Sequence, residues 1–163
     1  MHYRRNYHRG GLYFFTLVSF QRRPILTQSE IRQSLREAVY IVRDKHPFEI
    51  VGWVLLPDHL HTIWQLPENN ADYSMRWNQI KRRVSYRHRE MKIWQGRFWE
   101  HTIRDDQDFA RHFDYLHVNP VKHGYVSAVV DWPYSTFHRY VREGIYPRKW
   151  GGNGLDFTVA YDG

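Results

Sequence analysis

The run from Trp53 to Trp64, WVLLPDHLHTIW, places two apolar stretches on either side of a Pro-Asp pair. Such a pair between apolar runs is typical of a turn, so the run predicts two strands joined as a hairpin. The second strand begins with His59 and His61, separated by one apolar residue. Because alternate side chains of a strand share a face, both imidazoles are expected on one side of the sheet. Two neutral imidazoles side by side form half of a divalent-metal site; surface histidines on a half-buried strand are the alternative for this pattern.

Strand and helix signals alternate along the rest of the chain. Composition and periodicity predict strands at 12–20, 48–56, 59–66 and 98–104, and helices at about 28–45, 71–91, 107–117 and 134–143. Asn119-Pro120 is expected to end the third helix. This order predicts an α+β fold, with a mainly antiparallel sheet and helices packed on one face. We expect one domain over residues 1–150 and a C-terminal tail over 151–163.

The composition favours a polyanionic partner. Among 163 residues, 24 Lys and Arg stand against 17 Asp and Glu, and 17% of the residues are aromatic. A basic surface with many aromatic rings suits nucleic acid, whereas a small-molecule substrate or an anionic membrane fits less well. The sequence contains no membrane-spanning stretch, no signal-peptide core and no cysteine. The lack of cysteine excludes thiolate chemistry and fits a reducing, cytoplasmic compartment.

Two basic segments are candidates for contact with DNA. The helix predicted at 71–91 carries charge of almost one sign, which repels itself unless a polyanion lies against it, although a solvated charged face is the common alternative. Its candidate residues are Arg76, Lys81, Arg82, Arg83 and Arg87. The N-terminal arm adds Arg4, Arg5 and Arg9.

Tyr115 is the candidate nucleophile on the third helix. It lies off the apolar stripe of that helix and shares a face with Asn119, one turn further on, and with Arg111. A free phenol is a weak nucleophile at neutral pH, so Tyr115 needs a cation close by. The Asn119 carbonyl oxygen could complete a metal site with the two histidines. This mixed site suits Mg²⁺ or Mn²⁺ better than structural zinc, and we expect no organic cofactor.

Four segments in this order resemble the REP-associated tyrosine transposases, within the IS200-like superfamily that is named for its His-hydrophobic-His motif. They are WVLLPDHLH at 53–61, RFWEHTIR at 97–104, YLHVNPVKHGYV at 115–126 and WPYSTFH at 132–138. The run from Tyr115 to Val126 is the most specific of them.

The resemblance implies a ferredoxin-like fold and metal-dependent cleavage of single-stranded DNA beside a short imperfect hairpin, the repetitive extragenic palindrome (REP) of bacterial chromosomes. Tyr115 would attack the scissile phosphate, form a 5′-phosphotyrosine link and release a 3′-hydroxyl that can reverse the step. His59 and His61 carry over as metal ligands, while Glu100 and His101 receive no role. The resemblance also implies a bacterial, nucleoid-associated protein, as a monomer or homodimer, with no small-molecule substrate.

Two other functions compete with this one. The first is a non-catalytic, structure-specific DNA-binding protein derived from such a transposase. The second is a small-molecule metalloenzyme of the cupin type, which also places His-x-His on a strand but has a glutamate three or four residues later. Here Glu68 comes too late for that pattern.

Overall fold

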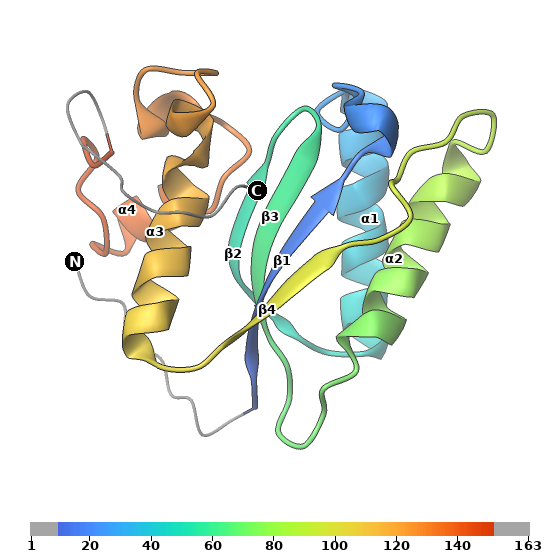
Figure 1. The fold of residues 1–163 in the computed structure, drawn as a ribbon, viewed down its shortest axis with the longest axis horizontal. Helices are drawn as coiled ribbons and strands as arrows, with labels where there is room; N and C mark the ends of the chain where they lie inside the picture. Colours follow the sequence, from blue (N-terminus) through green and yellow to red (C-terminus); the bar gives the residue numbers. More distant parts are fainter. Residues whose placement is uncertain (1–9, 152–163) are drawn as a thin grey trace.

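The computed structural model describes residues 10–151. Its four strands are β1 (Leu12–Val18), β2 (Glu49–Leu55), β3 (His59–Gln65) and β4 (Trp99–Ile103). They form one antiparallel sheet in the order β2-β3-β1-β4. The four helices are α1 (Ser29–Lys45), α2 (Tyr73–Arg87), α3 (Asp106–Lys122) and α4 (Phe137–Arg142). The predicted antiparallel α+β fold is therefore confirmed (Figure 1).

The predicted hairpin forms between β2 and β3. The Leu56 amide donates to the His59 carbonyl at 2.8 Å, which closes the turn over Pro57 and Asp58. A register shift between Ile50 and Gly52 interrupts the ladder. A Cβ atom at Gly52 would lie 3.2 Å from Leu116 of α3, so the glycine allows this helix to approach the sheet closely.

Helices cover both faces of the sheet, which differs from the predicted packing on one face. The side chains of Phe15, Leu17 and Trp64 pack with α1 and α2. Their neighbours in sequence, such as Phe14 and Ile63, pack with α3 and α4 on the opposite face. β1 is apolar on both faces, and the polar side chains of β3, including both histidines, are buried as well, so the two central strands are covered on both sides. The α3 face receives His59 and His61.

Helix α3 continues five residues beyond its predicted end. Pro120 lies inside it, so the helix lacks one backbone hydrogen bond but does not break. The chain leaves the helix only at Gly124, which has a φ of +78°. Because the helix runs through residue 119, Tyr115 and Asn119 lie one turn apart on one continuous element.

The segment after α3 closes the outer edge of β2. The Leu55 amide donates to the Tyr134 carbonyl at 2.9 Å, and the Trp53 amide donates to Thr136 Oγ1 at 3.0 Å. This segment therefore joins the α3 layer to the free side of the hairpin. Within residues 10–151, no helix is long and apolar enough to cross a membrane. The tail predicted from residue 151 lies outside the described residues, apart from Gly151 itself.

Candidate active site

The two histidines of β3 lie side by side under α3. Both are buried, and their ring centroids are 4.8 Å apart. Burial is the main cause that lowers the pKa of His61 well below its usual value, and the nearby His59 adds to it. His61 is therefore neutral at physiological pH, the form in which an imidazole binds a metal.

Each imidazole is held through its Nδ1 atom. His59 Nδ1 lies 2.7 Å from Asp58 Oδ1, and because a carboxylate only accepts, Nδ1 donates, which in the neutral imidazole leaves the lone pair on Nε2. His61 Nδ1 is bonded to Thr16 Oγ1 at 2.8 Å. Thr16 and His61 are direct partners in the β1–β3 ladder, so strand register sets this contact. A partner on Nδ1 that leaves Nε2 available is the usual arrangement around metal-binding histidines.

Asn119 brings an amide to the same point. Its Oδ1 lies 3.3 Å from His59 Nε2, and its Nδ2 has no hydrogen-bond partner among the described residues. With a neutral His59, Asn119 Oδ1 and His59 Nε2 are both acceptors and cannot bond each other. If the amide is turned over, its NH₂ group can donate to His59 Nε2, and its oxygen is then the atom without a partner. Either orientation leaves one buried amide atom unsatisfied by the protein. His61 Nε2 is also buried and without a partner among residues 10–151, so the donor set fits a cation.

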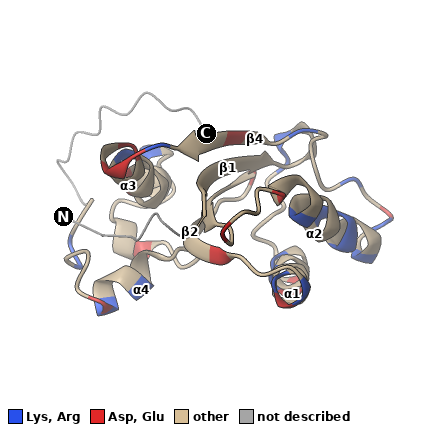
Figure 2. Ribbon diagram, turned by 90° about the horizontal axis from the view of Figure 1, so that it is seen from below, with Lys and Arg blue, Asp and Glu red and all other residues tan. Residues whose placement is uncertain are grey.

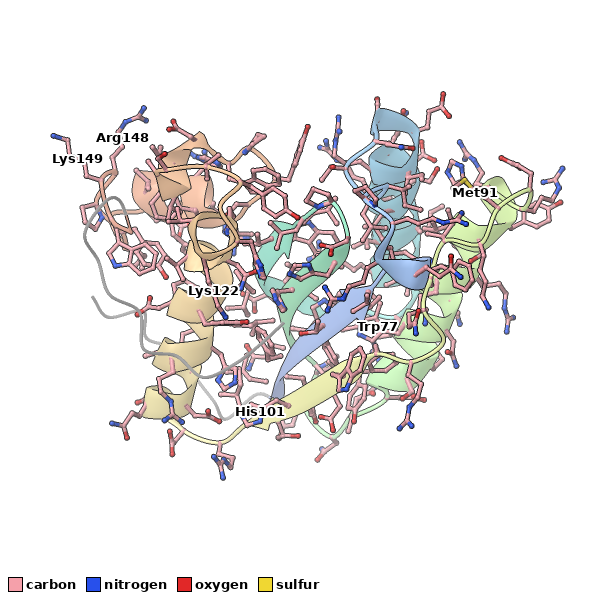
Figure 3. All side chains as sticks on the ribbon, turned by 45° about the horizontal axis from the view of Figure 1, so that its top comes forward. Trp77, Met91, His101, Lys122, Arg148 and Lys149 are labelled. Atoms are coloured by element: carbon pink, nitrogen blue, oxygen red, sulfur yellow. The ribbon has the colours of Figure 1, made fainter. Side chains whose placement is uncertain are left out.

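Tyr115 lies next to this set. Its ring centroid is 5.5 Å from that of His61, and the side chain is only 1% exposed. The sequence predicts it away from the apolar stripe of α3, yet it packs into the core because that side of the helix faces Phe14 of β1. Lys122 Nζ lies 3.4 Å from the Tyr115 hydroxyl and 4.8 Å from the ring centroid. Figure 3 shows Lys122 on the side of α3 that faces the sheet.

A second histidine cluster occurs on the same face of the sheet. His101 of β4 donates from Nε2 to Asp108 Oδ2 at 2.8 Å, and its ring stacks on His112 at 4.3 Å. These three residues have ligand atoms within 4.8 Å of one another, close enough to consider a metal. However, His112 Nδ1 also lies 2.8 Å from the Asp108 carbonyl, and Arg111 reaches the carboxylate at 3.4 Å. The cluster is thus an ion-pair network that ties β4 to α3, and it gives His101 a structural role.

The predicted DNA contacts separate into three groups. Arg4, Arg5 and Arg9 lie outside the described residues. Arg76 does not fit the prediction, because it is 1% exposed and its guanidinium binds the carbonyls of His46, Pro47 and Asp72. The remaining four, Lys81, Arg82, Arg83 and Arg87, lie on α2, where Figure 2 shows a concentration of Lys and Arg. Helix α2 covers the sheet face opposite the histidines.

Those four differ in exposure and pairing. Arg82 and Arg83 are exposed, whereas Arg87 is paired with Glu37 at 3.1 Å. Lys81 is half-buried and donates to the Gln95 carbonyl at 3.4 Å. Arg111, which the sequence places beside Tyr115, points instead to Asp108.

Several site residues escape sequence reasoning. Thr16 depends on a strand register that the sequence does not reveal. Asp58 reads only as part of a turn, although its position next to His59 is a usable signal. Lys122 and His123 follow Tyr115 by two helical turns, and the His123 ring lies 5.1 Å from His59. The Arg22 guanidinium pairs at 3.2 Å with the Asp58 carboxylate, which in turn holds His59.

Comparisons with known proteins identify the family of this chain. The family described as "Transposase IS200 like" matches residues 9–107, which include both histidines and end before Tyr115. A REP-associated tyrosine transposase of Escherichia coli (strain K12) is 49% identical over 97% of this chain and 95% of its own. A relative from Haemophilus influenzae is 46% identical, with 93% of each chain covered.

One solved structure matches the whole fold. It is a REP-associated tyrosine transposase bound to a REP hairpin, 48% identical, with a TM-score of 0.83 over 97% of this chain and 95% of that chain. The alignment therefore includes α3 and the segment after it, beyond the part matched by the family. With more than half of its residues matched to the family and a relative 49% identical along nearly its whole length, the protein belongs to the IS200-like transposases.

Proposed function

We propose that this transposase cleaves and rejoins single-stranded DNA beside REP-type hairpins, with Tyr115 as the nucleophile. The observation that carries the proposal is the grouping of the His59 and His61 rings, the Asn119 amide and the Tyr115 ring in one buried cluster. The names of the aligned relatives, one of which is bound to a REP hairpin, support the hairpin as the substrate.

His59, His61 and Asn119 would hold a divalent cation. Their set of two nitrogens and one oxygen leaves positions open for phosphate oxygens, which fits Mg²⁺ or Mn²⁺ better than a closed zinc site. Once bound, the cation would neutralise charge on the scissile phosphate and orient it. Asp58 and Thr16 keep the two rings in place through their Nδ1 atoms.

Tyr115 would supply the covalent step. Its oxygen forms a bond to the phosphorus and loses the phenolic proton, the bond from phosphorus to the 3′ oxygen breaks, and the released 3′ oxygen takes up a proton to become the 3′-hydroxyl. The Lys122 ammonium, 3.4 Å from the hydroxyl, favours negative charge on the phenolic oxygen during attack and return. The energy of the broken bond is kept in the phosphotyrosine link, so rejoining needs no external energy source.

The basic surface of α2 would hold the DNA backbone, chiefly through Arg82 and Arg83, together with the N-terminal arginines. We place catalysis and DNA binding in one domain over residues 1–150, acting as a monomer or homodimer at the bacterial nucleoid. Exposed rings such as Trp99, at 60%, favour unpaired bases. Single strands with a folded hairpin should therefore react better than the plain duplex.

The test is trapping of the covalent adduct. Wild-type protein, Tyr115→Phe and the control Tyr125→Phe are incubated with Mn²⁺ and a hairpin-bearing single strand, then denatured and resolved by electrophoresis. Tyr125 is 43% exposed and receives the same change. We expect wild type and Tyr125→Phe to form an adduct with the 5′ end of the cut strand, and Tyr115→Phe to bind the hairpin without forming one.

Two results would contradict the proposal. An adduct formed by Tyr115→Phe would remove this residue as the nucleophile. Tight hairpin binding by wild type, without cleavage in either Mg²⁺ or Mn²⁺, would favour the non-catalytic DNA-binding protein instead.

A further inference from the structure

A large groove runs along the outer edge of β2, away from the histidines. It has a volume of about 1270 Å³ and lies between α1 and the segment that leads into α4. Its wall on the α1 side carries Tyr40, which is 74% exposed, and its opposite wall carries Tyr134. Trp53 of β2 forms part of its floor. The groove therefore presents three aromatic rings along one channel.

The groove is also strongly basic. Glu37 is the one carboxylate among the residues that line it. Four arginines line it, three on α1 and one on α4: Arg32, Arg36, Arg43 and Arg139. Glu37 is paired with Arg87 of α2, and Arg139 is paired with Glu143 at 3.8 Å, so within residues 10–151 the basic charge of the groove rests on the three arginines of α1. Arg36 makes no ion pair within residues 10–151, and the Arg32 guanidinium lies 4.5 Å from the Tyr134 ring centroid. Guanidinium groups beside aromatic rings are the chemistry that binds an unpaired nucleic-acid strand.

A row of rings joins this groove to the candidate active site. The Tyr134 ring lies 5.8 Å from Trp132, and Trp132 lies 5.5 Å from Tyr125. The row continues from Tyr125 to His123 at 6.4 Å and from His123 to His59 at 5.1 Å. Tyr134 and Trp132 are half-buried, and Tyr125 is exposed. A strand that leaves the scissile phosphate can therefore follow aromatic surface as far as the groove.

The row is fixed to the hairpin of the sheet. Trp132 Nε1 donates to the Leu55 carbonyl at 2.9 Å, and the Tyr134 carbonyl accepts from the Leu55 amide at the same distance. Buried His117 bonds Thr136 Oγ1 at 2.8 Å from the α3 side. These contacts hold the rings in a fixed position relative to His59, so a strand lying on them would set the position of the phosphate at Tyr115.

We propose that this row and the arginine groove form a binding site for the unpaired DNA that flanks the hairpin, with the rings stacking its bases and the arginines contacting its phosphates. The inference extends the proposed function, because it assigns a path to the strand on one side of the cut. A paired duplex does not suit the site, since its bases are already stacked on each other. Binding here would place the hairpin on one side of the scissile phosphate and the single strand on the other.

The experiment measures binding without cleavage, in a Tyr115→Phe background. Three fluorescent probes are compared: the hairpin alone, the hairpin with an unpaired extension on its 5′ side, and the hairpin with an unpaired extension on its 3′ side. We expect one extension to increase affinity. Arg32→Gln with Arg36→Gln should remove most of this increase and lower the salt slope by roughly 0.7 for each phosphate group that the protein no longer neutralises. Affinity for the hairpin alone should stay the same.

The stacking role is tested at one ring. Tyr134→Leu should reduce the gain from the extension roughly tenfold, the size expected for one stacked base, whereas Tyr134→Phe keeps the ring and should keep the gain. Arg148→Gln is the charge control, because Arg148 is exposed and is not among the residues that line the groove. Melting temperatures of all variants show whether each one is folded.

The inference is overturned if neither extension increases affinity, or if the folded groove variants keep the whole increase. A failure of the proposed function gives a different result, because the wild-type protein would then form no covalent adduct with the cut strand. Loss of extension binding in the groove variants would support the groove even then.

Discussion

Two histidine–aspartate pairs lie on the α3 side of the sheet, and they differ in what their nitrogens contact. In one pair Asp58 holds His59, and in the other Asp108 holds His101. Phe14 separates the two clusters, with ring centroids 5.3 Å from His61 and 5.0 Å from His112. The first cluster has two buried polar atoms without a partner among residues 10–151, on His61 and Asn119. In the second, hydrogen bonds and arginines surround the carboxylate. The groups that already surround the candidate ligand atoms, more than the number of histidines or of unsatisfied nitrogens, therefore separate the candidate metal site from the structural network.

Removing either histidine of the first cluster should have the largest effect. We expect His59→Ala and His61→Ala to reduce cleavage to background, because each removes a cation ligand, while hairpin affinity stays close to that of wild type. Mn²⁺ should raise the melting temperature of wild type and not that of these variants. His101→Ala is the comparison variant, and it should keep the response to Mn²⁺. A melting response absent in His101→Ala and kept in His61→Ala would reverse the assignment of the two clusters.

The partners on Nδ1 should matter less than the ligands themselves. We expect Asp58→Ala and Thr16→Val to weaken metal affinity or activity by roughly 10- to 100-fold, as is usual when a ligand loses the group that orients it. Titration of cleavage with Mn²⁺ measures this, and high Mn²⁺ should restore part of the rate. Arg22→Gln removes only the exposed partner of Asp58, so its effect should be smaller. Loss of cleavage that no Mn²⁺ concentration restores would place Asp58 in the chemistry itself.

The second cluster should affect stability and its pH dependence. Burial acts to raise the pKa of Asp108, but hydrogen bonds from His101 and the Arg104 amide outweigh it and lower the pKa to about 2. Because this value lies below the ordinary 3.8, the carboxylate stabilises the fold above pH 3.8, and that contribution is lost as the pH falls toward 2. Asp108→Asn should therefore lower the free energy of unfolding at neutral pH by about 2 kcal/mol and flatten its decline in acid.

Chemical denaturation across this pH range provides the measurement. Asp106→Asn is the control, because Asp106 is an exposed aspartate in the same helical turn. Cleavage at neutral pH should survive in both variants at temperatures where they are folded. Loss of cleavage in a fully folded Asp108→Asn protein would count against a purely structural role.

Local patterns were enough to predict the hairpin and the shared face of His59 and His61, because both follow from the two-residue period of a strand. The spacing of Tyr115 and Asn119 likewise follows from one helical turn. The predictions that the structure contradicts concern features that depend on long-range packing. Pro120 disfavours a helix only locally, and α3 continues through it because its residues pack against the sheet. The burial of Arg76 and the partner of His61 both depend on how distant segments meet, which a single sequence does not state.

The smallest effect is expected on the face opposite both clusters, along α2. Arg82 and Arg83 are exposed, whereas neighbouring Arg87 already shares its charge with Glu37. Arg82→Gln with Arg83→Gln should therefore lower the salt slope of hairpin binding by roughly one unit for each phosphate group that is no longer neutralised, and Arg87→Gln by less. Cleavage at saturating DNA should not change, because these side chains lie across the sheet from Tyr115. Binding measured over a series of salt concentrations separates the two variants. An unchanged slope in the double variant would remove α2 from the DNA interface, and a lower rate at saturation would mean that this surface also positions the strand at the active site.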